Sequence, residues 1–234
     1  MRKCMDDQLA WTSQVDFVLQ KVHRKLGALR RASRCLNIAS RRLYYLSVIQ
    51  PDLLYGSTAY LHTICASDRR RIETACKSGV RTILSKPPWE PSSPLFQQLQ
   101  IYPIFTCMTV KQLSYAYRFI DSVKHENNSL SPLFTNFKIF VLRSSITSEH
   151  TRTTRGNTYH DLALPQVKRF THLFTLHVPT LWNTLPSSIR FSQSLHGFRT
   201  SCFKASRVPC NKIFLICWVF PSKITIKQTN KQTR

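Results

Sequence analysis

The chain has 234 residues, with 34 Lys and Arg against 11 Asp and Glu, so its formal net charge at pH 7 is +23. Hydrophobic residues make up 42% of it, which excludes a chain disordered by composition and suffices for the core of one domain or two small ones. The mutual repulsion of so many positive charges must be relieved by a polyanionic partner or screened by the solvent. Nucleic acid is the commonest such partner, and an anionic membrane is the lesser candidate.

Eight cysteines are spread along the chain without paired spacing, and the first residues do not resemble a signal peptide. We therefore expect free thiols in an intracellular protein, nuclear or cytoplasmic and not secreted. The longest apolar run near the end, Ile213 to Phe220, is less than half of the roughly 20 residues that a bilayer span requires. We expect no membrane segment and no membrane partner.

The first predicted helix begins near Ser13, because Ser13 and Asp16 have the spacing of a capping box. Apolar residues then follow at steps of four and three and share an arc of about 80°. They are Val15, Leu19, Val22, Leu26 and Leu29. Lys21, Arg24 and Arg31 fall on the opposite side, so the helix has a basic outer face, which is either a solvated surface or a nucleic-acid-binding face.

Further arginines follow this helix. Arg34, Arg41 and Arg42 stand in a stretch that has no acidic residue between Asp16 and Asp52. Because local carboxylates do not balance this charge, the pattern favours contact with phosphates.

Two more helices are predicted before residue 62. The first runs from about Ala39 to Ile49, with Leu43, Leu46 and Ile49 facing inward, and Pro51 ends or kinks it. The second is suggested by apolar residues between positions 53 and 61.

A fourth helix begins at Ser67 or Asp68, either of which can cap it. One face of it carries Ile72, Ala75, Cys76, Val80, Ile83 and Leu84. Its first turn holds Arg69, Arg70 and Arg71, which are unfavourable at the positive end of the helix dipole. Phosphate binding is one explanation for them, and chance is another.

The chain is expected to be mainly α and to divide into four parts. A helical bundle covers residues 6–86, and a proline-rich linker covers 87–94. A smaller, mostly helical C-terminal block covers 95–204, and an irregular, disordered tail covers 205–234.

Within the C-terminal block, helices are predicted from Leu95 to Leu99 and from Thr106 to Val123, with a polar connection after them and a short strand at Phe137 to Leu142. Pro186 suits the start of a short helix, and Ser192 or Ser194 can cap the last one. The large apolar residues near the end are interpreted as core. They are Phe170, Phe174, Trp182, Leu185, Ile189, Leu195, Phe198 and Phe203.

Three stretches together resemble one family. They run from Asp7 through Trp11 to Arg31, from Leu43 to Leu84, and from Thr154 to Arg199, the last containing Leu181-Trp182-Asn183-Thr184-Leu185-Pro186. In this order, over roughly residues 6 to 204, they resemble the region that follows the polymerase in reverse transcriptases of LINE-type non-LTR retrotransposons. Leu173 and Cys107 depart from the family pattern, which suggests divergence or decay.

The resemblance implies a thumb-like helical region at 6–86, which grips the template-primer duplex in that family, and a post-polymerase region at 95–204. The implied protein is a truncated remnant that lacks the catalytic palm, is no enzyme on its own, and binds RNA or DNA backbone without sequence preference. The candidate binding residues are Lys21, Arg24, Arg31, Arg34, Arg41, Arg42, Arg69, Arg70 and Arg71. The alternative is a host-adopted module that binds a protein partner through the apolar surface that once met the palm.

Two apparent sites are rejected on their context. Cys4-Met5-Asp6-Asp7 looks like the carboxylate turn of a reverse transcriptase, but no apolar strand flanks it, so we expect no catalytic residue. Cys202, Cys210 and Cys217 with His196 lack the spacing of a zinc site. We expect neither a metal nor another cofactor.

The last residues repeat Lys-Gln-Thr-Asn from Lys227 to Thr233. Reading tandem AAAC in triplets encodes that repeat, so we hypothesise that the tail is translated 3′ sequence. An ordinary polar tail is the alternative.

Overall fold

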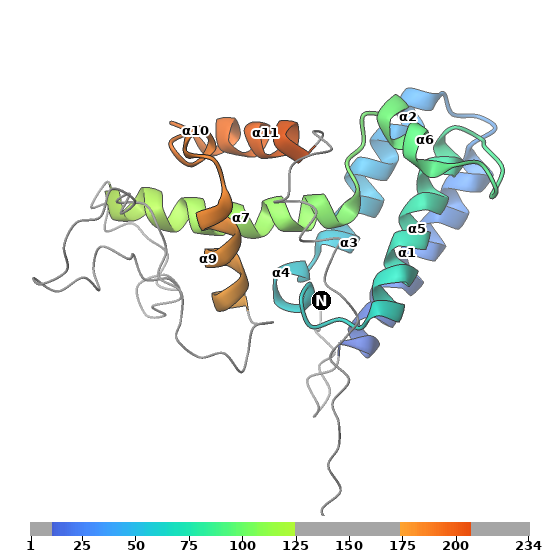
Figure 1. Ribbon diagram of the computed structural model, residues 1–234. Coiled ribbons are helices and arrows are strands. Elements are labelled where there is room, and N and C mark those ends of the chain that lie inside the picture. The colour runs from blue at the N-terminus through green and yellow to red at the C-terminus, as the bar shows by residue number, and fades with distance from the viewer. Residues whose placement is uncertain (1–10, 125–173, 207–234) are drawn as a thin grey trace, which may run out of the picture.

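The computed structural model describes residues 11–124 and 174–206, and all regular structure in these two ranges is helical (Figure 1). The mainly α prediction is thereby confirmed. The elements are α1 Thr12–Ala32, α2 Ile38–Tyr44, the π-helical turn η1 Tyr45–Ile49, α3 Gln50–Leu54, α4 Ser57–Tyr60, α5 Ala66–Ile83, α6 Ser92–Gln98, α7 Ile104–Lys124, α9 Phe174–Thr184, α10 Ser187–Arg190 and α11 Leu195–Ser206. The predicted strand, the Cys4–Asp7 turn and the tail from residue 207 lie outside the described residues.

Helices α1 and α5 pack side by side and are the two long helices of the first bundle (Figure 1). The five apolar residues predicted for the inner face of α1 are all buried, which confirms the periodicity argument. The predicted capping box is wrong, because α1 begins at Thr12 and no side chain caps it. Asp16 instead reaches across to α5, where its carboxylate lies 2.5 Å from Arg71.

The predicted second helix is interrupted, and its inward face agrees with the expected one at Ile49 but not at Leu43. Leu43 is 66% exposed, whereas Tyr45 and Ile49 are buried. Pro51 has no N–H to donate and its ring would clash with a carbonyl one turn back, so the chain widens into a π turn in which Gln50 N–H bonds the Tyr45 carbonyl. The wider turn places Tyr45, Ile49 and Leu53, four residues apart, on the buried side.

Two short helices replace the predicted third one. Gly56 separates α3 from α4 with φ of 68°, a left-handed conformation that glycine adopts without a steric penalty. Tyr60 at the end of α4 is buried and donates its hydroxyl to the Leu53 carbonyl at 3.1 Å.

Helix α5 buries the predicted face, with Ile72, Cys76 and Val80 each at most 2% exposed. Its predicted cap is wrong, because the helix begins at Ala66 and Cys65 occupies the cap position without a side-chain hydrogen bond. Asp68 lies in the first turn and is buried against Arg71.

Packing continues across the proline-rich segment at 87–94. Leu95 of α6, Leu99 directly after α6, and Phe105 and Met108 of α7 belong to the same apolar cluster as residues of α1 and α5. A second cluster begins at Val110 of α7 and includes residues of α9, α10 and α11. The change from one cluster to the other therefore falls inside α7, not at 87–94.

The second cluster is centred on the large residues predicted as core. Trp182 and Phe198 are fully buried, with ring centroids 5.6 Å apart. Ser194 caps α11 by accepting a hydrogen bond from Gly197 N–H at 3.1 Å, as one of the two predicted alternatives. Pro186 lies directly before α10. The side chains of Phe170 and Phe174 lie outside the described residues.

Candidate nucleic-acid interface

The outer face of α1 carries a basic stripe, which we define as Lys21, Arg24 and Arg31. Arg24 and Arg31 are exposed, and Lys21 is half-buried with its Nζ 4.2 Å from the centre of the Phe17 ring. The spacing of the three residues places them opposite the buried Leu26 side of the helix, as predicted. They form no ion pair with any described residue.

The acidic side chains of the described ranges are mostly engaged elsewhere. Ion pairs join Asp16 and Asp68 to Arg71, Asp52 to Lys25, Glu73 to Lys77, and Glu90 to Lys86. The charge of the basic stripe therefore has no carboxylate of the bundle to balance it, and it faces solvent.

Arg34 lies just beyond the C-terminal end of α1 and is exposed. Arg30 in the last turn donates to Ser78 Oγ of α5 at 2.8 Å. Because the helix dipole is negative at this end, arginines here also stabilise the helix. The end of α1 thus has a structural reason to be basic in addition to any ligand.

Arg41 and Arg42 differ from the basic stripe, because their guanidinium groups have acceptors within the protein. Arg41 donates to the carbonyls of Leu36, Ser33 and Ile83 and to Ser85 Oγ. Arg42 donates to the Leu99 carbonyl at 2.7 Å. Both guanidinium groups donate to backbone carbonyls that would otherwise lack a hydrogen-bond partner within the protein. These bonds connect segments that are distant in the sequence.

The three arginines that open α5 have three different environments. Arg71 pairs with Asp16 at 2.5 Å and with Asp68 at 2.9 Å, and these carboxylates raise the pKa of its guanidinium. Arg69 lies over the Phe105 ring at 4.8 Å. Arg70 is exposed and forms no ion pair with the residues that the structure describes. Carboxylates, not phosphates, account for Arg71 at the positive end of this helix.

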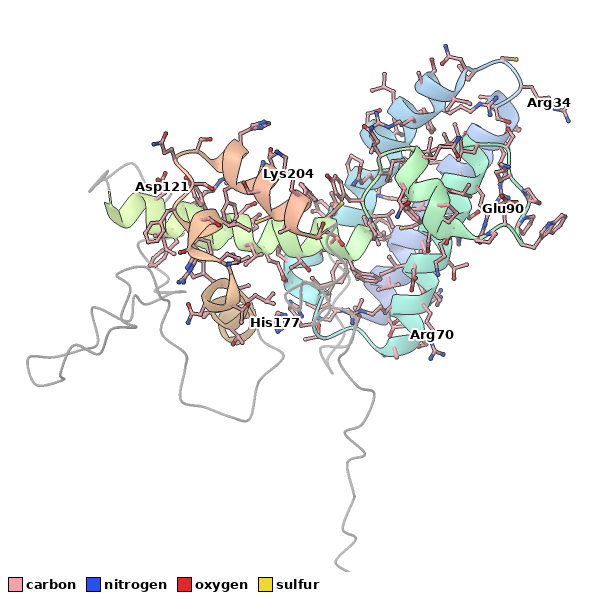
Figure 2. All side chains as sticks on the ribbon, turned by 45° about the horizontal axis from the view of Figure 1, so that its top comes forward. Arg34, Arg70, Glu90, Asp121, His177 and Lys204 are labelled. Carbon is pink, nitrogen blue, oxygen red and sulfur yellow. The ribbon has the colours of Figure 1, made fainter. Side chains whose placement is uncertain are left out.

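The nine predicted residues do not form one patch. Figure 2 shows Arg34 and Arg70 toward opposite ends of the first bundle. A helix as long as α1, with 21 residues, spans about 30 Å. The structure therefore places the basic stripe along α1 with Arg34 just beyond the C-terminal end of that helix, and Arg70 at the other end of the bundle (Figure 2).

Residues that the sequence interpretation missed lie at the turn after α5. Arg81 donates twice to the Glu90 carbonyl, from Nε at 3.0 Å and from Nη2 at 2.8 Å. Trp89 beside it is 82% exposed. The sequence does place this tryptophan between prolines in a basic chain, which could have marked it as a candidate site residue. The interpretation of the segment as a linker gave no reason to expect its side chain to be exposed.

In the ranges 11–124 and 174–206, no group of three or more His, Cys, Asp or Glu is placed to hold a metal ion. Cys202 is buried in α11, while His196 is exposed on the same helix. No helix of these ranges is long and apolar enough to cross a membrane.

Comparisons with protein families, with curated proteins and with solved structures found no match to this chain.

Proposed function

We propose that this chain derives from the thumb-like and post-polymerase region of a LINE-type reverse transcriptase and binds the backbone of RNA or DNA without sequence preference. The observation that carries the binding proposal is the basic stripe, whose charges face solvent while the neighbouring carboxylates pair elsewhere. The ordered resemblance over residues 6 to 204 supports the ancestry.

The geometry of the basic stripe suits a phosphate chain. Lys21 and Arg31 are ten positions apart on one helix, which corresponds to about 15 Å of helical rise. One strand of a duplex carries a phosphate about every 3.4 Å along its axis, so the three residues of the stripe extend over about four phosphate spacings. Contacts of this kind position a nucleic acid but carry no base information.

The proposal assigns no polymerase activity to the chain. Nucleotidyl transfer by two metal ions requires carboxylates fixed on a turn between apolar strands. Asp6 and Asp7 are followed by Gln8-Leu9-Ala10-Trp11, which lacks that pattern. The chain would act in the nucleus or cytoplasm, where its polyanionic ligand lies.

The experiment is a fluorescence-anisotropy titration of the full chain with a labelled RNA or DNA strand at low salt, repeated at rising salt. Non-specific binding has a Kd of about 10⁻⁴ to 10⁻⁶ M at physiological salt and weakens steeply as salt is added. We expect similar affinity for unrelated sequences and a strong loss with salt. Absence of binding at low salt, or binding that salt leaves unchanged, contradicts the proposal.

A second candidate function is binding of a protein partner, as expected for a host-adopted module. The observation in its favour is the exposure of Leu43 at 66% and Ile38 at 51% on α2. Replacing both with serine and measuring the oligomeric state and solubility of the chain tests this candidate. A stable, soluble and monodisperse product favours adoption, whereas an upstream reading frame that carries interrupted polymerase motifs favours decay.

A further inference from the structure

Trp89 exposes more of its surface than any other large apolar side chain of the described ranges, at 82%. A single exposed apolar residue is common on protein surfaces and needs no explanation by itself. Trp89 is different because the loop that carries it is held in place by several independent contacts.

Arg81 fixes the far side of this loop through its two hydrogen bonds to the Glu90 carbonyl. Lys86 N–H bonds the Arg81 carbonyl at 2.9 Å, and Glu90 N–H bonds the Pro87 carbonyl at 3.2 Å. Pro87 and Pro88 restrict the backbone further, since each has a fixed φ. The indole is therefore presented to solvent on a preorganised support, which reduces the entropy lost when a ligand binds it.

The loop that carries Trp89 is joined to the loop after α1, which carries Arg34. The Arg41 guanidinium bonds the Ser33 carbonyl and Ser85 Oγ, so it joins the loop after α1 to the loop after α5. Arg34 and Lys86 directly follow those two anchor points. The one acidic residue of the loop, Glu90, lies 3.6 Å from Lys86 Nζ and is thereby paired. Figure 2 shows Arg34 and Glu90 on the side of the bundle away from α11.

From this juxtaposition we propose that Trp89 is a stacking platform for an unpaired base of single-stranded RNA or DNA, whose backbone continues toward Arg34 and the basic stripe. This inference rests on the proposed function and makes it specific, because a duplex keeps its bases stacked and cannot offer one to the indole. Proteins that bind single strands combine a basic track for the backbone with aromatic side chains for the bases. The exposed positive charge of Arg34 favours a polyanion over a neutral apolar partner.

The test compares three labelled ligands with the full chain: a short oligothymidylate, a strand of equal length in which abasic sites replace the bases, and the corresponding duplex. The variants are Trp89→Ala and Trp89→Phe, with Phe191→Ala as a control because Phe191 is also exposed, at 47%. Affinities are measured by anisotropy at several salt concentrations.

We expect wild type to bind oligothymidylate more tightly than the abasic strand. Trp89→Ala weakens oligothymidylate binding by roughly 5- to 150-fold, the range for loss of one stacked base, and leaves the abasic strand and the salt slope unchanged. Trp89→Phe retains part of the preference, and Phe191→Ala retains all of it.

Equal affinity of wild type and Trp89→Ala for oligothymidylate overturns the stacking inference. If that equality comes with salt-dependent binding of every ligand, backbone binding stands and only the stacking fails. If no ligand binds at low salt, both proposals fail together. If Trp89→Ala instead abolishes binding of a protein partner while its single-strand affinity stays at the wild-type level, the indole belongs to a protein interface and the inference is likewise overturned.

Discussion

Lys25 of α1 stands 2.5 Å from Asp52 of α3, a carboxylate whose side chain is only 9% exposed. The same ammonium donates a hydrogen bond to the Val48 carbonyl at 2.9 Å. A lysine on the helix that carries the basic stripe thus also holds α3 in place.

Replacing Lys25 with methionine should destabilise the fold, because it leaves the Asp52 carboxylate mostly buried without its counter-charge. We expect a loss on the order of 2 kcal/mol in the free energy of unfolding, less than for a fully buried pair, since Lys25 is 34% exposed. Lys77→Met is the matched control, because its pair with Glu73 is more exposed, and it should cost less than about 0.5 kcal/mol. Urea denaturation measures both, and equal losses would argue against a structural role for Lys25.

Two helical glycines should respond to alanine with opposite signs. A Cβ at Gly79 would lie 2.6 Å from Tyr45 Cε2 and 3.3 Å from Leu26 Cδ2, so Gly79→Ala must push apart α5, η1 and α1. We expect it to destabilise the fold by about 1–3 kcal/mol. At Gly27 the nearest atom is Arg31 Nη1 at 3.7 Å, so Gly27→Ala should stabilise by about 0.5–1 kcal/mol through helix propensity. Thermal unfolding of the two variants checks the sign of each, and a neutral Gly79→Ala would contradict the described packing.

Trp182 should be a stability residue. It is fully buried against Phe198, and Trp182→Ala should lower the free energy of unfolding by about 3–5 kcal/mol. Phe191→Ala, at a 47% exposed position, should change it by no more than about 0.5 kcal/mol. A Trp182→Ala variant with unchanged stability and weakened ligand binding would instead make this tryptophan a contact residue.

Buried thiols should make the fold sensitive to alkali. Burial raises the pKa of Cys76, Cys107 and Cys202 from 9.0 to about 12, so the folded state keeps their protons where the unfolded state has released them. Stability is therefore intact below about pH 9 and falls as the pH rises toward 12, by up to about 1.4 kcal/mol per pH unit for each thiol. Thermal melts across this range measure the slope.

The same burial predicts selective thiol chemistry. Exposed Cys35 and Cys65 should react with a maleimide at neutral pH, whereas Cys76, Cys107 and Cys202 should react only after unfolding. Peptide mass spectrometry distinguishes them, and early labelling of Cys76 would contradict the fold.

Helical periodicity was sufficient to predict the buried faces of α1 and α5, because each face depends on neighbours three or four positions away. It failed at Leu43, where Pro51 widens the helix into a π turn and brings Tyr45 to the buried side together with Ile49, which was predicted to face inward. This shift of the buried face depends on the backbone hydrogen bonds of the turn before Pro51. The pattern of hydrophobic residues does not predict those bonds.

The candidate interface was predictable only in part, for a related reason. Lys21, Arg24 and Arg31 share a face by local spacing, and the structure keeps them together. Arg71 pairs with Asp16 across 55 positions, and Arg41 reaches Ile83 across 42. Contacts at such separations determine whether an arginine has a structural role. Composition and local spacing do not reveal these contacts, so they cannot distinguish a structural arginine from one that is free to bind a ligand.

The salt dependence of binding tests the central claim most directly. The change is Arg24→Gln with Arg31→Gln on the basic stripe, and the charge-matched control is Arg118→Gln with Lys204→Gln, both exposed on other helices. Anisotropy titrations of a single-stranded oligonucleotide over a series of salt concentrations give the slope of log K against log salt for each protein. Removing two phosphate-binding charges should reduce the magnitude of that slope by about 1.4, at roughly 0.7 per neutralised phosphate, while the control keeps the wild-type slope. Equal slopes for the stripe variant and the control would contradict the assignment of this face to nucleic acid.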